Sequence, residues 1–164
     1  MRMNEIDRED KIAVYLELPL SASKFENGVS TYTIFFYVKL NYLTMDLAID
    51  SKRLELPLDC NSFKKSILAS GIYPMFVCTC GLTVCDSIYV NVVINTNLIK
   101  WTKFFRLDDF GQPTILISDF SYQFDLDEYL GAISSIETLV KFYSDSLGKE
   151  NVFFFPGRSV VELD

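Results

Sequence analysis

The chemistry open to this chain is limited first by the absence of histidine. With no histidine among 164 residues, the sequence excludes serine or cysteine catalysis with a histidine base, histidine-ligated zinc hydrolysis and imidazole proton transfer. Phosphate-binding loops of the GxxxxGK and GxGxxG types are also missing, so we expect neither a nucleotide nor another cofactor. Carboxylates, tyrosines, lysines and thiols remain as reactive groups.

Three of the four cysteines form a short run, Cys78-Thr79-Cys80-Gly81-Leu82-Thr83-Val84-Cys85. Structural zinc takes four thiolate or imidazole ligands, but the paired C-x-x-C spacing that marks many such sites is missing. We therefore interpret these residues as small buried thiols at a strand–turn–strand junction. The alternatives are a zinc site formed by Cys60, Cys78, Cys80 and Cys85, and a redox pair of Cys80 and Cys85.

The negative charge is concentrated in one part of the chain. The formal charge is −7, from 22 acids and 15 bases, and residues 107–140 hold the whole surplus without a single lysine or arginine. The seven acids in this stretch are Asp108, Asp109, Asp119, Asp125, Asp127, Glu128 and Glu137. Such a field repels nucleic acids and anionic lipids and attracts basic partners.

Aromatic residues are interleaved with these acids, which is typical of a surface that binds a basic protein. We predict a partner-binding face with Tyr122 and Tyr129 as its anchors. The same aromatic residues would alternatively belong to the core. The predicted partner-binding residues are Asp108, Asp109, Asp119, Tyr122, Asp125, Asp127, Glu128 and Tyr129.

Each group of acids also has a local interpretation. Asp108 and Asp109 precede Gly111 and Pro113, and adjacent aspartates are common turn formers. Acids in the first turn of a helix, here Asp125 to Glu128, stabilise its macrodipole. A catalytic pair of carboxylates is the least supported interpretation, because no acid pair is fixed by its spacing on one rigid element. We therefore predict that the protein is not an enzyme.

The elements that must position these residues are mostly strands. Alternating or continuous apolar runs predict strands, and Asn27-Gly28 and Asn95-Thr96-Asn97 predict hairpin turns. The apolar phase changes at Tyr42, which predicts a bulge or tight turn. The expected strands cover residues 11–20, 31–42, 54–58, 72–79, 87–94, 99–105 and 114–120, with a final hairpin of 152–155 and 159–163.

Two helices complete the predicted fold. Asn61 is expected to cap a short helix over 62–70, ended by Gly71. A 3,4-spaced apolar stripe from Leu126 to Leu147 predicts a long amphipathic helix over about 125–148, with an Asp125–Glu128 capping box. We expect one α+β domain over 1–164, a mainly antiparallel sheet covered on one face by the long helix.

The sequence also predicts where the protein is located. Residues 1–11 are charged without a following signal-peptide core, and no apolar run approaches the ~18 residues of a membrane span. We expect a cytoplasmic protein with reduced thiols and no membrane partner.

Two resemblances add expectations about function. The turn formed by Cys78, Cys80, Gly81 and Cys85, the strand after it and Trp101 resemble a loosely defined group of small uncharacterised bacterial proteins. This likeness covers about 25 of the 164 residues. The small, acidic, histidine-free profile is similar to immunity proteins of bacterial toxin systems of the contact-dependent inhibition type. That resemblance implies neutralisation of a basic toxin domain, possibly a nuclease, but immunity proteins share no motif that would assign residues here.

Overall fold

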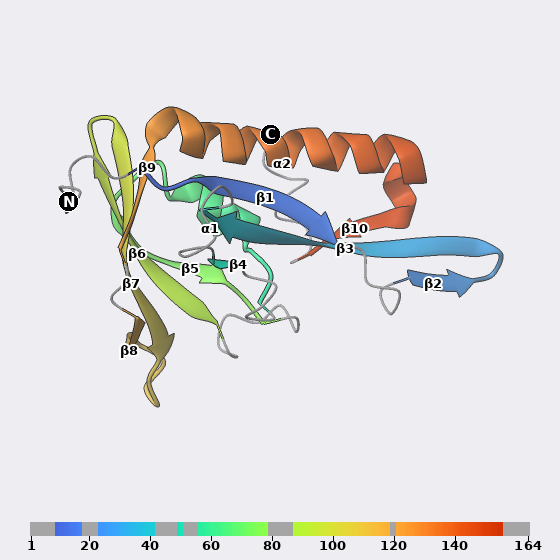
Figure 1. The fold of residues 1–164 in the computed structure, drawn as a ribbon. Helices are drawn as coiled ribbons and strands as arrows, with labels where there is room; N and C mark the ends of the chain where they lie inside the picture. The colour runs from blue at the N-terminus through green and yellow to red at the C-terminus, as the bar shows by residue number, and fades with distance from the viewer. Residues whose placement is uncertain are drawn as a thin grey trace.

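The computed structural model describes residues 9–17, 23–41, 49–50, 56–78, 87–118 and 121–155. These residues form two five-stranded sheets, a long helix and a short helix (Figure 1). The α+β class and the mainly antiparallel pairing are confirmed, although the strands form two sheets where the sequence analysis considered one. No helix in the described part of the chain is long and apolar enough to cross a membrane.

The first sheet is built around one long strand, β3 (Val29–Leu40). The edge strand β1 pairs with its second half and β2 with its first half, both antiparallel. Asn27 and Gly28 have φ angles of 52° and 79° between β2 and β3, as the predicted hairpin turn requires. The other strands of this sheet are β1 (Ile12–Glu17), β2 (Ser23–Glu26), β4 (Ile49–Asp50) and β10 (Val152–Phe154).

The second sheet has the order β5-β6-β7-β8 and is entirely antiparallel. Strand β9 pairs with the first part of β7, and β8 with the last part. The predicted turn over residues 95–97 connects β6 to β7. The strands are β5 (Gly71–Phe76), β6 (Ile88–Asn95), β7 (Leu98–Leu107), β8 (Pro113–Ser118) and β9 (Tyr122–Asp125).

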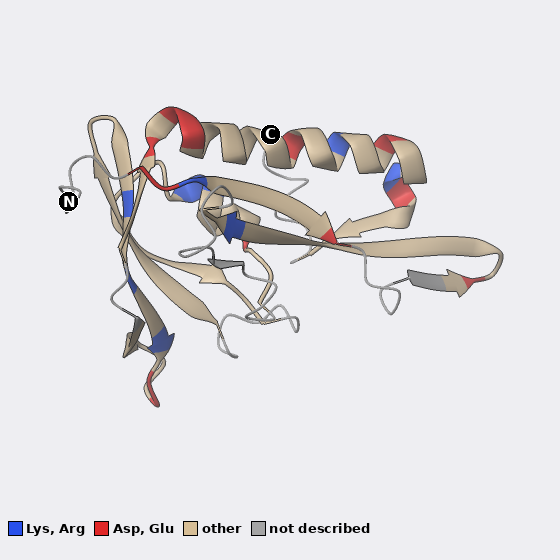
Figure 2. Ribbon diagram, in the orientation of Figure 1, with Lys and Arg blue, Asp and Glu red and all other residues tan. Residues whose placement is uncertain are grey.

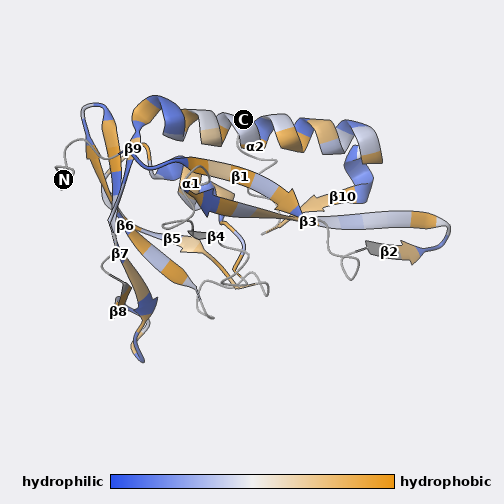
Figure 3. Cartoon of the chain, in the orientation of Figure 1, coloured by the Kyte–Doolittle hydropathy of each residue, from blue (hydrophilic) through white to orange (hydrophobic). Residues whose placement is uncertain are grey.

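Helix α2 (Leu126–Leu147) follows β9 directly and matches the predicted long helix. The Asp125 carboxylate caps it by accepting from the Asp127 N–H at 3.1 Å, and Gly148 ends it with a φ of 90°. Figure 3 shows hydrophobic and hydrophilic residues alternating around it. The helix covers the first sheet, where it packs against β1 and β10.

The short helix α1 (Cys60–Lys65) starts earlier and is shorter than predicted. Its N-cap is Asp59, not Asn61, because the Asp59 carboxylate accepts from the N–H groups of Asn61 and Ser62 at 3.0 and 3.2 Å. Of the strand expected over 54–58, residues 54 and 55 lie outside the described residues. Among the described ones, a single bridge joins Leu58 to Phe76.

The end of the described chain also differs from the prediction. After a 3₁₀ turn at Lys149–Asn151, β10 pairs in parallel with Tyr32–Ile34 of β3. Its predicted hairpin partner, 159–163, lies outside the described residues, as does the phase change after Tyr42.

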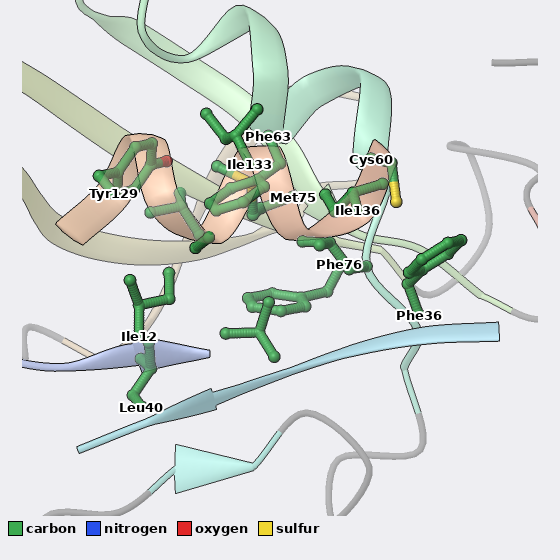
Figure 4. Close-up of a cluster of buried hydrophobic side chains, with 14 of the residues drawn as sticks. Ile12, Phe36, Leu40, Cys60, Phe63, Met75, Phe76, Tyr129, Ile133 and Ile136 are labelled. Carbon is green, nitrogen blue, oxygen red and sulfur yellow. The ribbon is translucent and has the colours of Figure 1, made fainter. Parts of the chain in front are cut away.

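One buried cluster contains residues of both sheets and both helices. Figure 4 shows side chains of α1, α2, β1 and β3 pointing into it. Trp101 is fully buried among aromatic rings that approach it edge-on, at centroid distances of 5.3 to 6.4 Å, a favourable arrangement for aromatic pairs. The rings around Trp101 are Phe63, Phe76, Phe104, Phe124 and Tyr129.

Candidate functional site

The fold divides the acidic stretch between the two ends of β7. Asp108 and Asp109 follow its last residue, whereas Leu98 at its start pairs with Asp125, where β9 passes into α2. The strand has ten residues, which span about 30 Å at the usual rise. Figure 2 shows acidic residues at both places. The expectation of one continuous acidic face is therefore wrong; Asp119 lies outside the described residues.

Asp108 stabilises the tip of the β7–β8 hairpin. Its carboxylate accepts hydrogen bonds from the Gln112 N–H, the Thr114 hydroxyl and the Phe110 N–H at 2.9, 2.7 and 2.9 Å. These bonds, above all that from Gln112, lower the pKa of Asp108. They support the turn interpretation of Asp108 and Asp109, since Asp108 is occupied within its own loop.

The two predicted anchors belong to the core. Tyr122 and Tyr129 are both buried, and the Tyr129 hydroxyl contacts Ser66 Oγ at 2.6 Å and Trp101 Nε1 at 3.2 Å. Burial raises the pKa of Tyr129. The prediction that these rings anchor a partner is wrong, because a ring enclosed by protein offers no surface to a second molecule.

The acids at the start of α2 border a hollow. An open cavity of about 290 Å³ lies between β1 and the first turns of α2. Its lining combines apolar residues with two acidic residues, Asp127 and Glu128. The lining residues are Ile12, Ala13, Val14, Asp127, Glu128, Gly131, Ala132 and Ser135.

A buried aspartate holds β1 in place beside α2. Asp10 donates its N–H to the Gln123 carbonyl at 2.7 Å and accepts the Gln123 N–H on its carboxylate at 2.8 Å. This pair ties the residues just before β1 to β9, three residues before α2 begins. Two small residues, Gly131 and Ala132, are part of the lining of the hollow, and a Cβ at Gly131 would meet nothing within 4 Å.

The charge around the hollow is negative. Asp127 is exposed and Asp125 and Glu128 are half-buried; among the described residues neither Asp125 nor Asp127 forms an ion pair with a lysine or arginine. Lys11 on the adjoining segment lies 4.0 Å from Glu9, and the closer ion pair, Lys64–Glu137 at 2.9 Å, lies further along α2. A helix N-terminus carries about half a positive charge, so the carboxylates of Asp125 and Asp127 outweigh it.

The cysteines are only partly within the described residues. Cys60 is completely buried in the core, and burial raises its pKa, which disfavours the thiolate that zinc requires. Cys78 is half-buried, while Cys80 and Cys85 lie outside the described residues. In the described part of the chain no three potential metal ligands come together. Cys60 is therefore a buried thiol, and the alternative of a zinc site stays a prediction.

Three residues of this region were not predicted from the sequence: Ile12 and Gly131, which line the hollow, and Asp10, which ties the segment before β1 to β9. No local pattern marks them, because β1 and α2 are more than 100 residues apart in the chain. For Tyr129, by contrast, the sequence pattern indicates burial. It lies four and seven positions before Ile133 and Ile136, the spacing of one buried helix face.

Comparisons with protein-family models, curated proteins and solved structures found no match to this chain.

Proposed function

We propose that this chain is a non-enzymatic binding protein whose β1–α2 hollow accepts a lysine or arginine side chain of a basic partner protein. The observation that carries the proposal is a lining that combines the apolar residues Ile12, Val14 and Ala132 with the acidic residues Asp127 and Glu128. Long basic side chains have the matching pattern, an aliphatic stem and a charged head.

Electrostatics favours a basic partner over an acidic one or a nucleic acid. The chain has a formal charge of −7, which accelerates encounter with cationic proteins and repels phosphate backbones. The acids at the start of α2 then fix the docking position. The half-buried Glu128 is screened less by salt than a fully exposed carboxylate would be.

The narrower form of the proposal is an immunity protein that neutralises a basic toxin domain, possibly a nuclease, in the cytoplasm. It is supported by the acidic, histidine-free composition and by the resemblance of the overall profile to such proteins. Occlusion of a toxin's basic active site would require contacts beyond one hollow, with Asp125 and Asp127 at the rim of the interface.

Two charge-matched variants test the proposal against a lysine–alanine peptide, with a glutamate–alanine peptide of the same length as the negative probe. Asp127→Asn/Glu128→Gln removes both carboxylates at the hollow, and we expect about tenfold weaker binding of the basic peptide by calorimetry. Asp108→Asn/Asp109→Asn removes the same charge at the hairpin tip and should change binding much less. Equal losses in the two variants would mean that only net charge matters, and would contradict the proposed site.

A further inference from the structure

Strand β8 exposes three consecutive apolar side chains. Ile115, Leu116 and Ile117 are 50%, 51% and 45% exposed. The described part of the chain therefore leaves about half of each of these side chains uncovered. Figure 1 shows the β7–β8 hairpin projecting away from both helices.

The outer edge of β8 is also open. It is the last strand in the order β5-β6-β7-β8, and none of the described strands pairs with its other side. Protein edges of this kind are usually protected by charged residues, prolines or bulges. Strand β8 contains no charged residue and has a proline only at its first position, but its pairing with β7 shifts register at Thr114 and at Ile117. An uncharged, apolar edge strand is a template for pairing with another strand.

The sequence of β8 is nearly symmetric about its central leucine. Residues 114–118 read Thr-Ile-Leu-Ile-Ser, a hydroxyl residue, an isoleucine, a leucine, an isoleucine and a hydroxyl residue in either direction. We infer that β8 pairs antiparallel with β8 of a second copy of this chain, about a two-fold axis through Leu116. Isologous pairing of this kind closes at two copies.

In a regular antiparallel register, the symmetry would pair similar residues across the axis. Thr114 lies opposite Ser118 of the second copy, Ile115 opposite its Ile117, and the two Leu116 residues face one another. Hydroxyl pairs and β-branched pairs are favourable across antiparallel strands. The pairing would cover the apolar side chains of the hairpin together with its open edge.

Charge selects the antiparallel arrangement. Parallel pairing would place the acidic tips of the two hairpins, each with Asp108 and Asp109, beside one another. In the antiparallel arrangement each tip lies beyond Pro113, three positions from the axis, so the tips are at least about 20 Å apart, well beyond the Debye length of about 8 Å. The exposed Arg106 lies beside Ile115 on β7, and the two copies of Arg106 are separated by three strand spacings, about 14 Å.

The dimer should be a weak one. A single six-residue strand per copy buries less than the ~1,200 Å² of a standard stable interface, and the charge of −7 on each copy opposes association. We therefore expect dissociation in the micromolar range rather than the nanomolar range.

Sedimentation equilibrium at concentrations up to the order of 100 μM tests the inference on the intact chain. The wild-type protein should approach twice the 18.8 kDa of one copy. Ile115→Lys/Ile117→Lys places like charges opposite one another twice and should raise the dissociation constant about tenfold or more. Ile115→Lys/Ile117→Glu places opposite charges at the same positions and should still dimerise.

Matched controls separate pairing from surface charge and from misfolding. Leu68→Lys/Phe142→Lys adds the same two charges at exposed apolar positions elsewhere and should leave the dimer intact. Leu116→Lys, which faces itself across the axis, should be monomeric with an unchanged circular dichroism spectrum. A wild-type protein that stays monomeric at the highest concentration would overturn the inference. A strand of a different protein would then be the remaining candidate to pair with β8. Equal behaviour of the Lys/Lys and Lys/Glu variants would also overturn it. The β1–α2 hollow is not involved in this test.

Discussion

The hydroxyl of Tyr129 forms a directed chain of hydrogen bonds inside the core. Ser66 Oγ donates to the Phe63 carbonyl at 2.6 Å, so Tyr129 donates to Ser66 Oγ and accepts from Trp101 Nε1. Burying these polar groups is tolerable only because each has a partner. The residue that the sequence suggested as a surface anchor therefore orients the central tryptophan.

Tyr129→Phe should lower the free energy of unfolding by about 1–3 kcal/mol, because the indole N–H of Trp101 loses its acceptor while staying buried. Urea denaturation followed by tryptophan fluorescence measures this change. Tyr73→Phe is the control: its hydroxyl bonds backbone carbonyls at an exposed position, so the loss there should be smaller. A Tyr129→Phe protein as stable as wild type would contradict the hydrogen-bond chain.

Two buried groups should also make the fold sensitive to alkali. Burial raises the pKa of Cys60 above its ordinary 9.0 and that of Tyr129 above its ordinary 10.0. Groups whose pKa is raised by folding contribute stability that is fully present below the unfolded pKa and is lost as pH rises beyond it. Unfolding should therefore become easier above pH 9, by up to about 1.4 kcal/mol per pH unit for each group. Cys60→Ala should flatten the dependence between pH 9 and 10 in urea titrations; an unchanged slope would contradict this account.

Local signals explain which elements could be predicted. Asp125, the apolar stripe and Gly148 lie within or next to α2 itself, and the predicted and observed helix nearly coincide. At α1, two neighbouring residues can both cap, and Asp59 makes the bonds that the sequence analysis assigned to Asn61. Which sheet a strand joins depends on distant pairing, such as the parallel contact of β10 with β3, and no local pattern contains that information.

Gly131 is a small residue in the lining of the hollow beside α2. Gly131→Ala should raise the free energy of unfolding by about 0.5–1 kcal/mol, because glycine is unfavourable within a helix and the added Cβ meets nothing within 4 Å. Gly131→Phe should fill the hollow without changing the charge. We expect it to weaken the binding of the lysine–alanine peptide about tenfold. If the phenylalanine variant binds the peptide like the alanine variant, the hollow is not the binding site.

At the scale of the whole molecule, the fold separates acidic residues that lie close together in the sequence. Residues 107–140 are continuous in sequence, but β7 separates their first acids from the acids of α2 by its full length. Asp108 caps the turn of its own hairpin, Glu137 pairs with Lys64, and Asp127 and Glu128 at the start of α2 border a hollow. Composition could predict an acidic binding protein, but only three-dimensional contacts between β1 and α2 select the position.

Nuclear magnetic resonance titration of the ¹⁵N-labelled chain with the lysine–alanine peptide tests the central claim most directly. The account predicts saturable shifts of the backbone amides of Ala13, Val14, Asp127, Glu128 and Gly131 around the hollow, with little change at Asp109 and Phe110. Shifts confined to the β7–β8 hairpin, or spread evenly over all exposed acids, would contradict it.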